Sequence, residues 1–272
     1  MKLSSETRVL ITGGASGIGL LVGRALARKG CRVTVWDVNE SALARAEADA
    51  KADGLDIRGM LCDVSDRDAV YRAAEAVRQS WGSPDVLINN AGIVSGSTFL
   101  ETDDAKIERT MGINVLSNFW TVKAFLPGMI ERDRGHIVTV SSAAGIIGVT
   151  GLADYSASKF AVFGFHEAMR MELRKRKSRV GTTVICPFFV GTGMFEGVKT
   201  RFPLLLPILK PDYVAKRIVR AVEKGSKRVI LPRFVYSVYL LRLLPVALLD
   251  LIADFFGISA AMDGFRGRGA GD

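Results

Sequence analysis

A tyrosine and a lysine four positions apart, Tyr155 and Lys159, are the residues of this sequence best suited to acid–base chemistry. They lie in the run Tyr-Ser-Ala-Ser-Lys of an expected helix, where side chains at positions i and i+4 share one face. A nearby ammonium stabilises a phenolate, so we expect the pKa of the tyrosine to fall below its usual value of about 10. Such a phenol can exchange a proton with an alcohol or a ketone. Because this spacing occurs on many helices by chance, its companions decide what it means.

Two polar residues accompany the pair. Ser142 ends an expected strand thirteen positions before Tyr155 and can donate a hydrogen bond to a substrate oxygen. Asn114 lies inside a long expected helix that follows the fourth expected strand.

A glycine-rich turn follows the first expected strand and leads directly into a helix. Glycines allow the backbone to approach a pyrophosphate, which then lies at the positive N-terminus of that helix. Asp37 ends the second expected strand, 18 positions after Gly19, where a carboxylate can accept hydrogen bonds from both adenosine ribose hydroxyls. The same carboxylate repels a 2′-phosphate, and the turn has no Arg or Lys to neutralise one, so NAD is favoured over NADP. The candidate cofactor residues of the turn are Gly13, Ser16, Gly17, Ile18 and Gly19.

Short apolar runs alternate with helical patterns through most of the chain. The expected strands are Arg8–Thr12, Arg32–Trp36, Asp56–Leu61, Val86–Asn89, His136–Ser141 and Thr182–Cys186. The expected helices are Gly17–Lys29, Ser41–Asp53, Asp66–Trp81, Asp103–Met129 and Asp154–Arg176. This alternation predicts a single α/β domain with a parallel sheet covered by helices on both faces. Ligands of such sheets bind at the carboxyl ends of the strands, near the switch in strand order.

Three features together resemble the classical short-chain dehydrogenases/reductases: the TGxxxGxG turn, the run Asn89-Asn90-Ala91-Gly92, and the Ser, Tyr and Lys spacing. The resemblance covers about residues 8–232 and implies a doubly wound Rossmann fold with a mostly parallel seven-stranded sheet. It implies catalytic roles for Ser142, Tyr155, Lys159 and Asn114. Lys159 would also hold the nicotinamide ribose, and Asn114 would hold a water in a proton relay. The resemblance implies cofactor-binding roles for the glycine turn, Asp37, Tyr155 and Lys159. It adds these cofactor-binding residues: Asp63, Val64, Asn90, Ala91, Gly92, Pro187, Val190 and Thr192.

One position departs from the family pattern. Phe188 stands where the family usually has a glycine after the proline, which puts the local turn and the pocket wall in question. An apolar lid is expected at residues 190–210, with these covering side chains: Phe195, Phe202, Leu204, Leu205, Leu206, Ile208 and Leu209.

Shorter runs resemble one branch of the family, the retinol dehydrogenases and lipid-droplet hydroxysteroid dehydrogenases. These runs are 118–127, 135–138 and 164–167. We therefore expect an NAD(H)-dependent oxidoreductase that interconverts a lipophilic primary or secondary alcohol and its aldehyde or ketone. One alternative is a 3-oxoacyl thioester reductase, but such an enzyme would use NADPH, and Asp37 argues against NADPH. The other alternative is a non-catalytic NAD-binding module at a membrane surface. The resemblance also implies a homodimer or homotetramer.

The net charge of +9 is unevenly distributed. Residues 1–169 carry −2, residues 170–180 carry +5, and residues 199–272 carry +7 among Leu, Phe and Pro. Basic and apolar residues in one segment favour an anionic membrane surface over a nucleic acid as partner, and we expect no nucleic-acid binding.

The remaining composition indicates a reducing compartment. Three scattered cysteines without CxxC spacing suit the cytoplasm better than a disulfide framework. His136 and His166 have no ligand-spaced neighbours, so we expect no metal site and interpret them as surface or hydrogen-bonded helix histidines. The polar start, Met1 to Thr7, predicts neither a signal peptide nor an N-terminal anchor.

We expect two regions, a Rossmann-type domain over 1–232 and a C-terminal extension over 233–272. The apolar stretch 234–256 is broken by Arg242, Pro245, Asp250 and Asp254, which predicts two short amphipathic helices rather than a membrane span. Those helices either contact a membrane peripherally or pack on the lid or a second subunit. The end of the chain, 264–272, is glycine-rich and is expected to be flexible.

Overall fold

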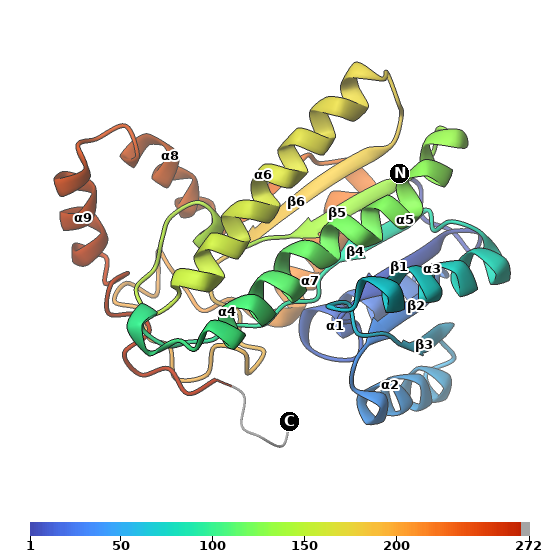
Figure 1. The fold of residues 1–272 in the computed structure, drawn as a ribbon, viewed down its shortest axis with the longest axis horizontal. Helices are drawn as coiled ribbons and strands as arrows, with labels where there is room; N and C mark the ends of the chain where they lie inside the picture. Colours follow the sequence, from blue (N-terminus) through green and yellow to red (C-terminus); the bar gives the residue numbers. More distant parts are fainter. Residues whose placement is uncertain (268–272) are drawn as a thin grey trace.

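The strands of the sheet all run in the same direction in the computed structural model, which describes residues 1–267 (Figure 1). Their order across the sheet is β3-β2-β1-β4-β5-β6-β7. The strands are β1 (Arg8–Thr12), β2 (Arg32–Asp37), β3 (Ile57–Leu61), β4 (Val86–Asn89), β5 (His136–Val140), β6 (Gly181–Pro187) and β7 (Arg228–Leu231). The doubly wound α/β fold expected from the sequence is therefore confirmed. The sheet is entirely parallel rather than mostly so.

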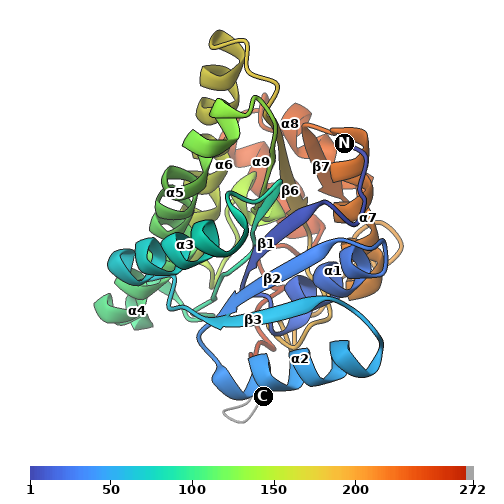
Figure 2. The ribbon, with the colours of Figure 1, turned by 90° about the vertical axis from the view of Figure 1, so that its right-hand side faces the viewer.

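Helices connect the strands and cover both faces of the sheet (Figure 2). They are α1 (Gly17–Ala27), α2 (Glu40–Ala52), α3 (Arg67–Trp81), α4 (Asp104–Met111), α5 (Ser117–Glu131), α6 (Ala153–Lys175), α7 (Pro211–Lys224), α8 (Ser237–Leu241) and α9 (Val246–Phe255). Short 3-10 turns lie at η1 (Phe99–Glu101), η3 (Ala143–Gly145) and η4 (Arg233–Tyr236).

The helix expected over 103–129 is not continuous. A π-helical turn, Gly112–Leu116, separates α4 from α5. Such turns insert an extra residue into a helix and often occur at functional sites. Here the turn contains Asn114, whose side chain is bonded to other segments and not to solvent.

Alternation along each strand divides the core into two layers. In β1, Val9 and Ile11 pack on the face covered by α1 and α7, whereas Leu10 packs on the face covered by α3 and α5. Since the sheet is covered on both faces, its strands are largely apolar, although Thr34, Thr139 and Thr183 are buried polar residues inside them. The polar and small residues at the strand ends are left to form the site.

The chain after β7 returns to the carboxyl ends of the strands. α8 and α9 stand at the edge of the molecule, at the left of Figure 1, and the segment that follows crosses back beneath the sheet. Phe265 packs against Gly96, where a side chain would overlap its ring, and Arg266 N donates to Glu196 O at 2.8 Å. Part of the end expected to be flexible thus makes contacts, and residues 268–272 lie outside the described residues. Among residues 1–267, we find no helix whose length and apolar content suffice to cross a bilayer.

The two histidines are buried, not on the surface. His136 Nε2 lies 2.8 Å from Thr183 Oγ1, and His166 Nδ1 lies 3.1 Å from Thr139 Oγ1. Burial lowers the pKa of each imidazole from 6.5 to about 4.

These histidines predict acid sensitivity of the fold. Below pH 6.5 the unfolded chain protonates both imidazoles while the folded chain does not, so stability is lost as the pH falls toward 4. Each histidine should lower the free energy of unfolding by on the order of 3 kcal/mol between pH 6.5 and pH 4. Urea unfolding between pH 7 and 5 measures this, and the double variant H136Q/H166Q should show a much shallower slope. An equal slope in the variant would mean that other groups cause the acid sensitivity.

Candidate active site

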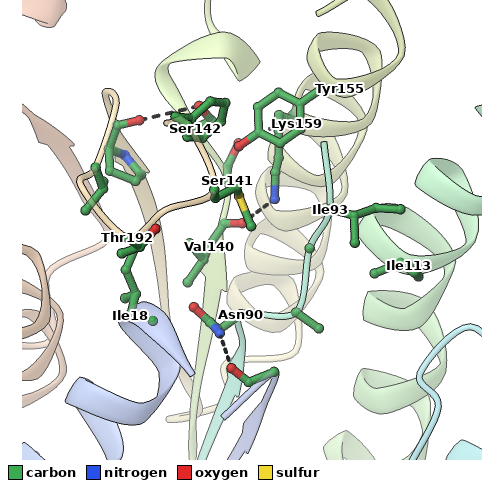
Figure 3. Close-up of a pocket in the computed structure, with 18 of the residues that line it drawn as sticks. Ile18, Asn90, Ile93, Ile113, Val140, Ser141, Ser142, Tyr155, Lys159 and Thr192 are labelled. Atoms are coloured by element: carbon green, nitrogen blue, oxygen red, sulfur yellow. Dashed lines mark hydrogen bonds between the residues drawn. The ribbon is translucent and has the colours of Figure 1, made fainter. Parts of the chain in front are cut away.

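The ends of β1 and β4 are joined by side-chain hydrogen bonds at the point where the strand order switches. Thr12 Oγ1 accepts from the backbone N of Asn90 and of Ala91, each at 3.1 Å. Asn90 Nδ2 donates to Thr12 O at 3.0 Å and to Gly13 O at 2.9 Å (Figure 3). These bonds hold the glycine turn and the loop after β4 on either side of one crevice.

Two glycines of the turn are required by close approach. Gly13 has a φ of +62°, and a Cβ there would lie 2.9 Å from Ala91 Cα. A Cβ on Gly19 would overlap Gly13 O and lie 2.6 Å from Asn90 Nδ2. Gly19 therefore allows α1 to pack on the turn, and it does not itself line the crevice.

Asp37 lies at the end of β2 with its carboxylate held in place. Its Oδ2 accepts from Ala15 N at 3.1 Å, and its Oδ1 accepts from Asn39 N at 3.2 Å. Each oxygen keeps further acceptor capacity, which faces the same crevice.

Tyr155 and Lys159 project from one face of α6 toward the end of β5, beside Ser142 (Figure 3). Their exposed fractions are only 5% and 4%. Lys159 Nζ donates to Val140 O at 3.1 Å and lies 5.4 Å from the centroid of the Tyr155 ring. Gly92 lies next to this ammonium, since a Cβ there would be 3.4 Å from Nζ, an ordinary van der Waals distance.

Burial controls the acidity of both groups. It raises the pKa of Tyr155 to about 12, although a hydrogen bond from Ser142 opposes the rise. It lowers the pKa of Lys159 to about 8. The expectation that the pKa of Tyr155 falls is thus wrong for this structure, because the loss of hydration on burial raises it.

Asn114 lies behind the catalytic pair. Its Nδ2 donates to Ile93 O at 3.0 Å and to Ser158 Oγ at 2.9 Å, and its Oδ1 accepts from Ile93 N at 2.8 Å. The side chain therefore clamps the loop after β4 to the helix that carries Tyr155.

One cavity of about 280 Å³ brings the remaining predicted residues together. It is lined by Gly13, Ser16, Gly17, Ile18, Asp37, Asp63, Val64, Asn90, Ala91, Gly92, Ser142, Tyr155, Lys159, Pro187, Val190 and Thr192. Of the predicted residues, Gly19 and Asn114 adjoin this cavity without lining it.

The cavity wall around Tyr155 is apolar, and the first part of the expected lid contributes Val190, Thr192, Met194 and Phe195 to it. Of the expected covering side chains only Phe195 reaches the cavity, 5.7 Å from Tyr155 between ring centroids. Leu206 and Leu209 are buried in the core, and Phe202 packs on Phe255 and Phe256. The wall is completed by residues that the sequence did not predict, namely Ile147, Val149, Leu152, Phe189 and Ile258.

The departure at Phe188 is accommodated without loss of the turn. Phe188 N donates to Leu231 O at 2.7 Å. The Phe188 ring packs edge-on against the Phe189 ring, with 4.7 Å between the ring centroids. Phe188 therefore contributes to the apolar wall.

Asp154 is a buried acid that the sequence reasoning also missed. Its Oδ1 accepts from Ser95 Oγ at 2.6 Å, and its Oδ2 accepts from Thr110 Oγ1 at 2.8 Å. These bonds join α6, α4 and the loop after β4 directly beside Tyr155. Its place next to Tyr155 in the first helical turn was the only signal available in the sequence.

Comparison with known proteins agrees with this geometry. Residues 7–201 match the family described as short chain dehydrogenase. The chain belongs to the short-chain dehydrogenase family. It is accordingly an oxidoreductase, and the glycine turn and the Ser, Tyr and Lys group occupy the matched region.

Curated relatives in this family extend over nearly the whole chain. Mouse (Mus musculus) epidermal retinol dehydrogenase 2 is 43% identical over 263 residues, which cover 96% of this chain and 85% of that protein. Bovine (Bos taurus) short-chain dehydrogenase/reductase family 16C member 6 is 42% identical, covering 96% and 83%.

Solved structures share the fold. A short-chain dehydrogenase/reductase from Burkholderia phymatum, in complex with NAD, has a TM-score of 0.79 and 27% identity, covering 89% of this chain and 95% of that one. An F189W variant of actinorhodin polyketide ketoreductase with NADPH has a TM-score of 0.76 and 29% identity, covering 85% and 97%.

The network around Asp154 predicts the effect of a near-isosteric change. Asp154→Asn replaces one acceptor oxygen by an amide donor that faces a donating hydroxyl, so we expect a loss of about 1–3 kcal/mol in the free energy of unfolding. Because Ser95 lies in the loop whose Val94 packs near Tyr155, KM for substrate should rise more than KM for the nucleotide. Steady-state kinetics measure this, with exposed Asp104→Asn on α4 as the control. Equal KM changes would show that Asp154 is only structural.

Proposed function

We propose that this chain is an NAD(H)-dependent oxidoreductase that interconverts a lipophilic primary or secondary alcohol and its aldehyde or ketone. The observation that carries the proposal is the single cavity, in which a glycine cradle and an anchored carboxylate meet a Ser, Tyr and Lys group surrounded by apolar walls.

The residues present fit a dinucleotide. Gly17 and Ile18 line the cavity at the start of α1, where the first backbone N–H groups of a helix can bind a pyrophosphate. Asp37 would accept hydrogen bonds from the ribose hydroxyls, and Asp63 and Val64 would lie beside the adenine. Thr192 would bond the carboxamide, and Lys159 the nicotinamide ribose. When bound, the nicotinamide supplies the hydride acceptor or donor.

The chain's own residues supply the proton chemistry. In reduction, Tyr155 donates its phenolic proton to the carbonyl oxygen, a role that its raised pKa favours at neutral pH. In oxidation, the Tyr155 phenolate accepts the alcohol proton while Ser142 orients the oxygen. Lys159 stabilises the phenolate, and Asn114 would take part in proton exchange with bulk water, the role that the family resemblance implies.

The apolar walls and the relatives together favour a lipophilic substrate. Phe189, Phe195, Leu152 and Ile258 provide little to bind a sugar or a short hydroxy acid. Relatives at 38–44% identity are named retinol dehydrogenases. A 3-oxoacyl thioester reductase stays the second candidate, since a polyketide ketoreductase shares the fold. We expect a cytoplasmic homodimer or homotetramer.

The direct experiment measures NADH formation with short secondary alcohols, long-chain alcohols, retinol, hydroxysteroids and a 3-hydroxyacyl thioester. Turnover of the bulky apolar alcohols with NAD supports the proposal. Turnover confined to the thioester with NADP, seen as NADPH formation, contradicts it, and tight NAD binding without turnover favours a non-catalytic binding module.

Asp37 predicts cofactor discrimination. Asp37→Ala removes two ribose hydrogen bonds and the charge that repels a 2′-phosphate, so NAD affinity should fall roughly ten- to hundred-fold while NADP affinity rises or stays constant. Calorimetric titration with both nucleotides measures the ratio. Damage to the turn alone would weaken both nucleotides equally, and an unchanged ratio would refute the ribose contact.

Tyr155 predicts a pH dependence. Oxidation needs the phenolate, and a pKa raised toward 12 leaves most of the tyrosine protonated at neutrality, so kcat for oxidation should rise from pH 6 to 8. Tyr155→Phe should lower kcat by at least about 100-fold with NAD affinity retained. Single-turnover rates across this range test the assignment, and a flat profile in the unsubstituted enzyme would argue against it.

A further inference from the structure

Two apolar helices at the end of the chain are left uncovered. Of the residues described in α8 and α9, none is buried, although α9 is Val-Ala-Leu-Leu-Asp-Leu-Ile-Ala-Asp-Phe. Leu243 is 82% exposed and Val246 is 72% exposed. Leu204, in the neighbouring loop, is 99% exposed. Together with Leu240, Leu251 and Phe255, these residues form what we call the C-terminal apolar face. Apolar surface gathered in this way marks an interaction site rather than ordinary scatter.

The helices that carry this face are fixed to the catalytic domain. Arg242, just after α8, donates to Ile146 O at 2.6 Å and lies 5.4 Å from the Phe160 ring centroid on α6. Arg228 lies 5.4 Å from the ring centroid of Tyr239. The apolar side chains are therefore held outward by defined contacts.

A basic side chain, Arg201, borders the face. Arg201 lies over Phe202 and Phe255, at 5.7 and 5.5 Å from their ring centroids. Lys199, Lys210 and Arg233 are exposed in the same part of the sequence, and residues 199–272 carry a net charge of +7. Asp250 and Asp254 are the exposed acids of α9. Apolar residues with an arginine among aromatic rings suit the boundary between acyl chains and anionic headgroups.

The same segment reaches the catalytic cavity. Ile258, three residues after α9, lines the cavity beside Tyr155. Ala261 and Met262 pack in one cluster with Leu152 and Tyr155. A surface that receives α9 would consequently lie next to the cavity wall.

We propose that the C-terminal apolar face is a membrane-docking surface that inserts into an anionic phospholipid bilayer and places the cavity against the lipid. With the cavity against the lipid, a substrate could enter it from the bilayer. This part of the proposal rests on the proposed function. A second copy of this chain fits the face less well, because a two-fold interface brings the same positively charged segment against itself. Anionic headgroups complement the net charge of +7 that residues 199–272 carry.

Docking is tested by sedimentation of the full chain with phosphatidylcholine vesicles, with and without about one-third phosphatidylglycerol. The anionic vesicles should bind the protein more strongly, and added salt should weaken binding. Leu243→Glu and Leu251→Glu should each lower the partition coefficient about tenfold or more, since each removes one leucine side chain that the bilayer would bury. The control is Leu61→Glu, the same change at a 59% exposed leucine on β3, the edge strand farthest from β7.

The outcomes separate docking from catalysis. Tyr155→Phe should bind vesicles like the unsubstituted protein, so docking is decided even if no alcohol is oxidised. Leu243→Glu should oxidise a short soluble alcohol normally and a bilayer-dissolved long-chain alcohol slowly. The proposal is overturned if the unsubstituted protein fails to sediment with anionic vesicles, or if Leu61→Glu loses as much binding as Leu243→Glu. It is also overturned if Leu243→Glu changes only the oligomeric state in sedimentation velocity, which would assign the face to a second copy.

Discussion

The burial of the Lys159 ammonium is the constraint on which the site depends. Removing a charge from water is costly unless polar partners replace hydration, and Val140 O at 3.1 Å is the partner here. The position of that carbonyl is set by β5, which ends at Val140, and Gly92 lies on the other side of the ammonium. Where these conditions meet, burial lowers the pKa of Lys159 and raises that of Tyr155, so that both groups lie nearer to neutral forms.

The parallel sheet provides the conditions for that burial. Its strands are largely apolar, and some polar side chains inside them are bonded to a partner, as Thr139 is to His166 and Thr183 is to His136. The ends of β1, β4, β5 and β6 lie side by side, and the bonds between Thr12 and Asn90 bring the first two together across the switch in strand order. The site is thus a consequence of which strands are neighbours. Neighbouring strands can be far apart in sequence, as β1 and β4 are, which pair Val9 with Val86.

Three segments outside the sheet complete the site. Asp154 connects α6 with α4 and with the loop after β4 through two hydroxyl groups. Asn114 makes a second connection between the same loop and α6 from within a π-helical turn. The C-terminal segment contributes Ile258 to the cavity and packs Phe265 on Gly96. The wall on the substrate side therefore depends on the end of the chain as much as on the loop after β6.

The local signals of this protein lie in its sequence. Strand and helix periods, the glycine turn, Asp37, and the Tyr155 and Lys159 spacing are patterns within a few residues of one another, and they predicted the sheet and the residues that line one cavity. The continuous helix over 103–129 and the lowered tyrosine pKa were wrong, and only the first part of the lid expected over 190–210 reaches the cavity. Only the tertiary structure decided these, as it decided the buried histidines, the Asp154 network and the place of Ile258. Burial, desolvation and contacts between distant segments arise only when the chain packs, whereas periodicity and spacing are present before it folds.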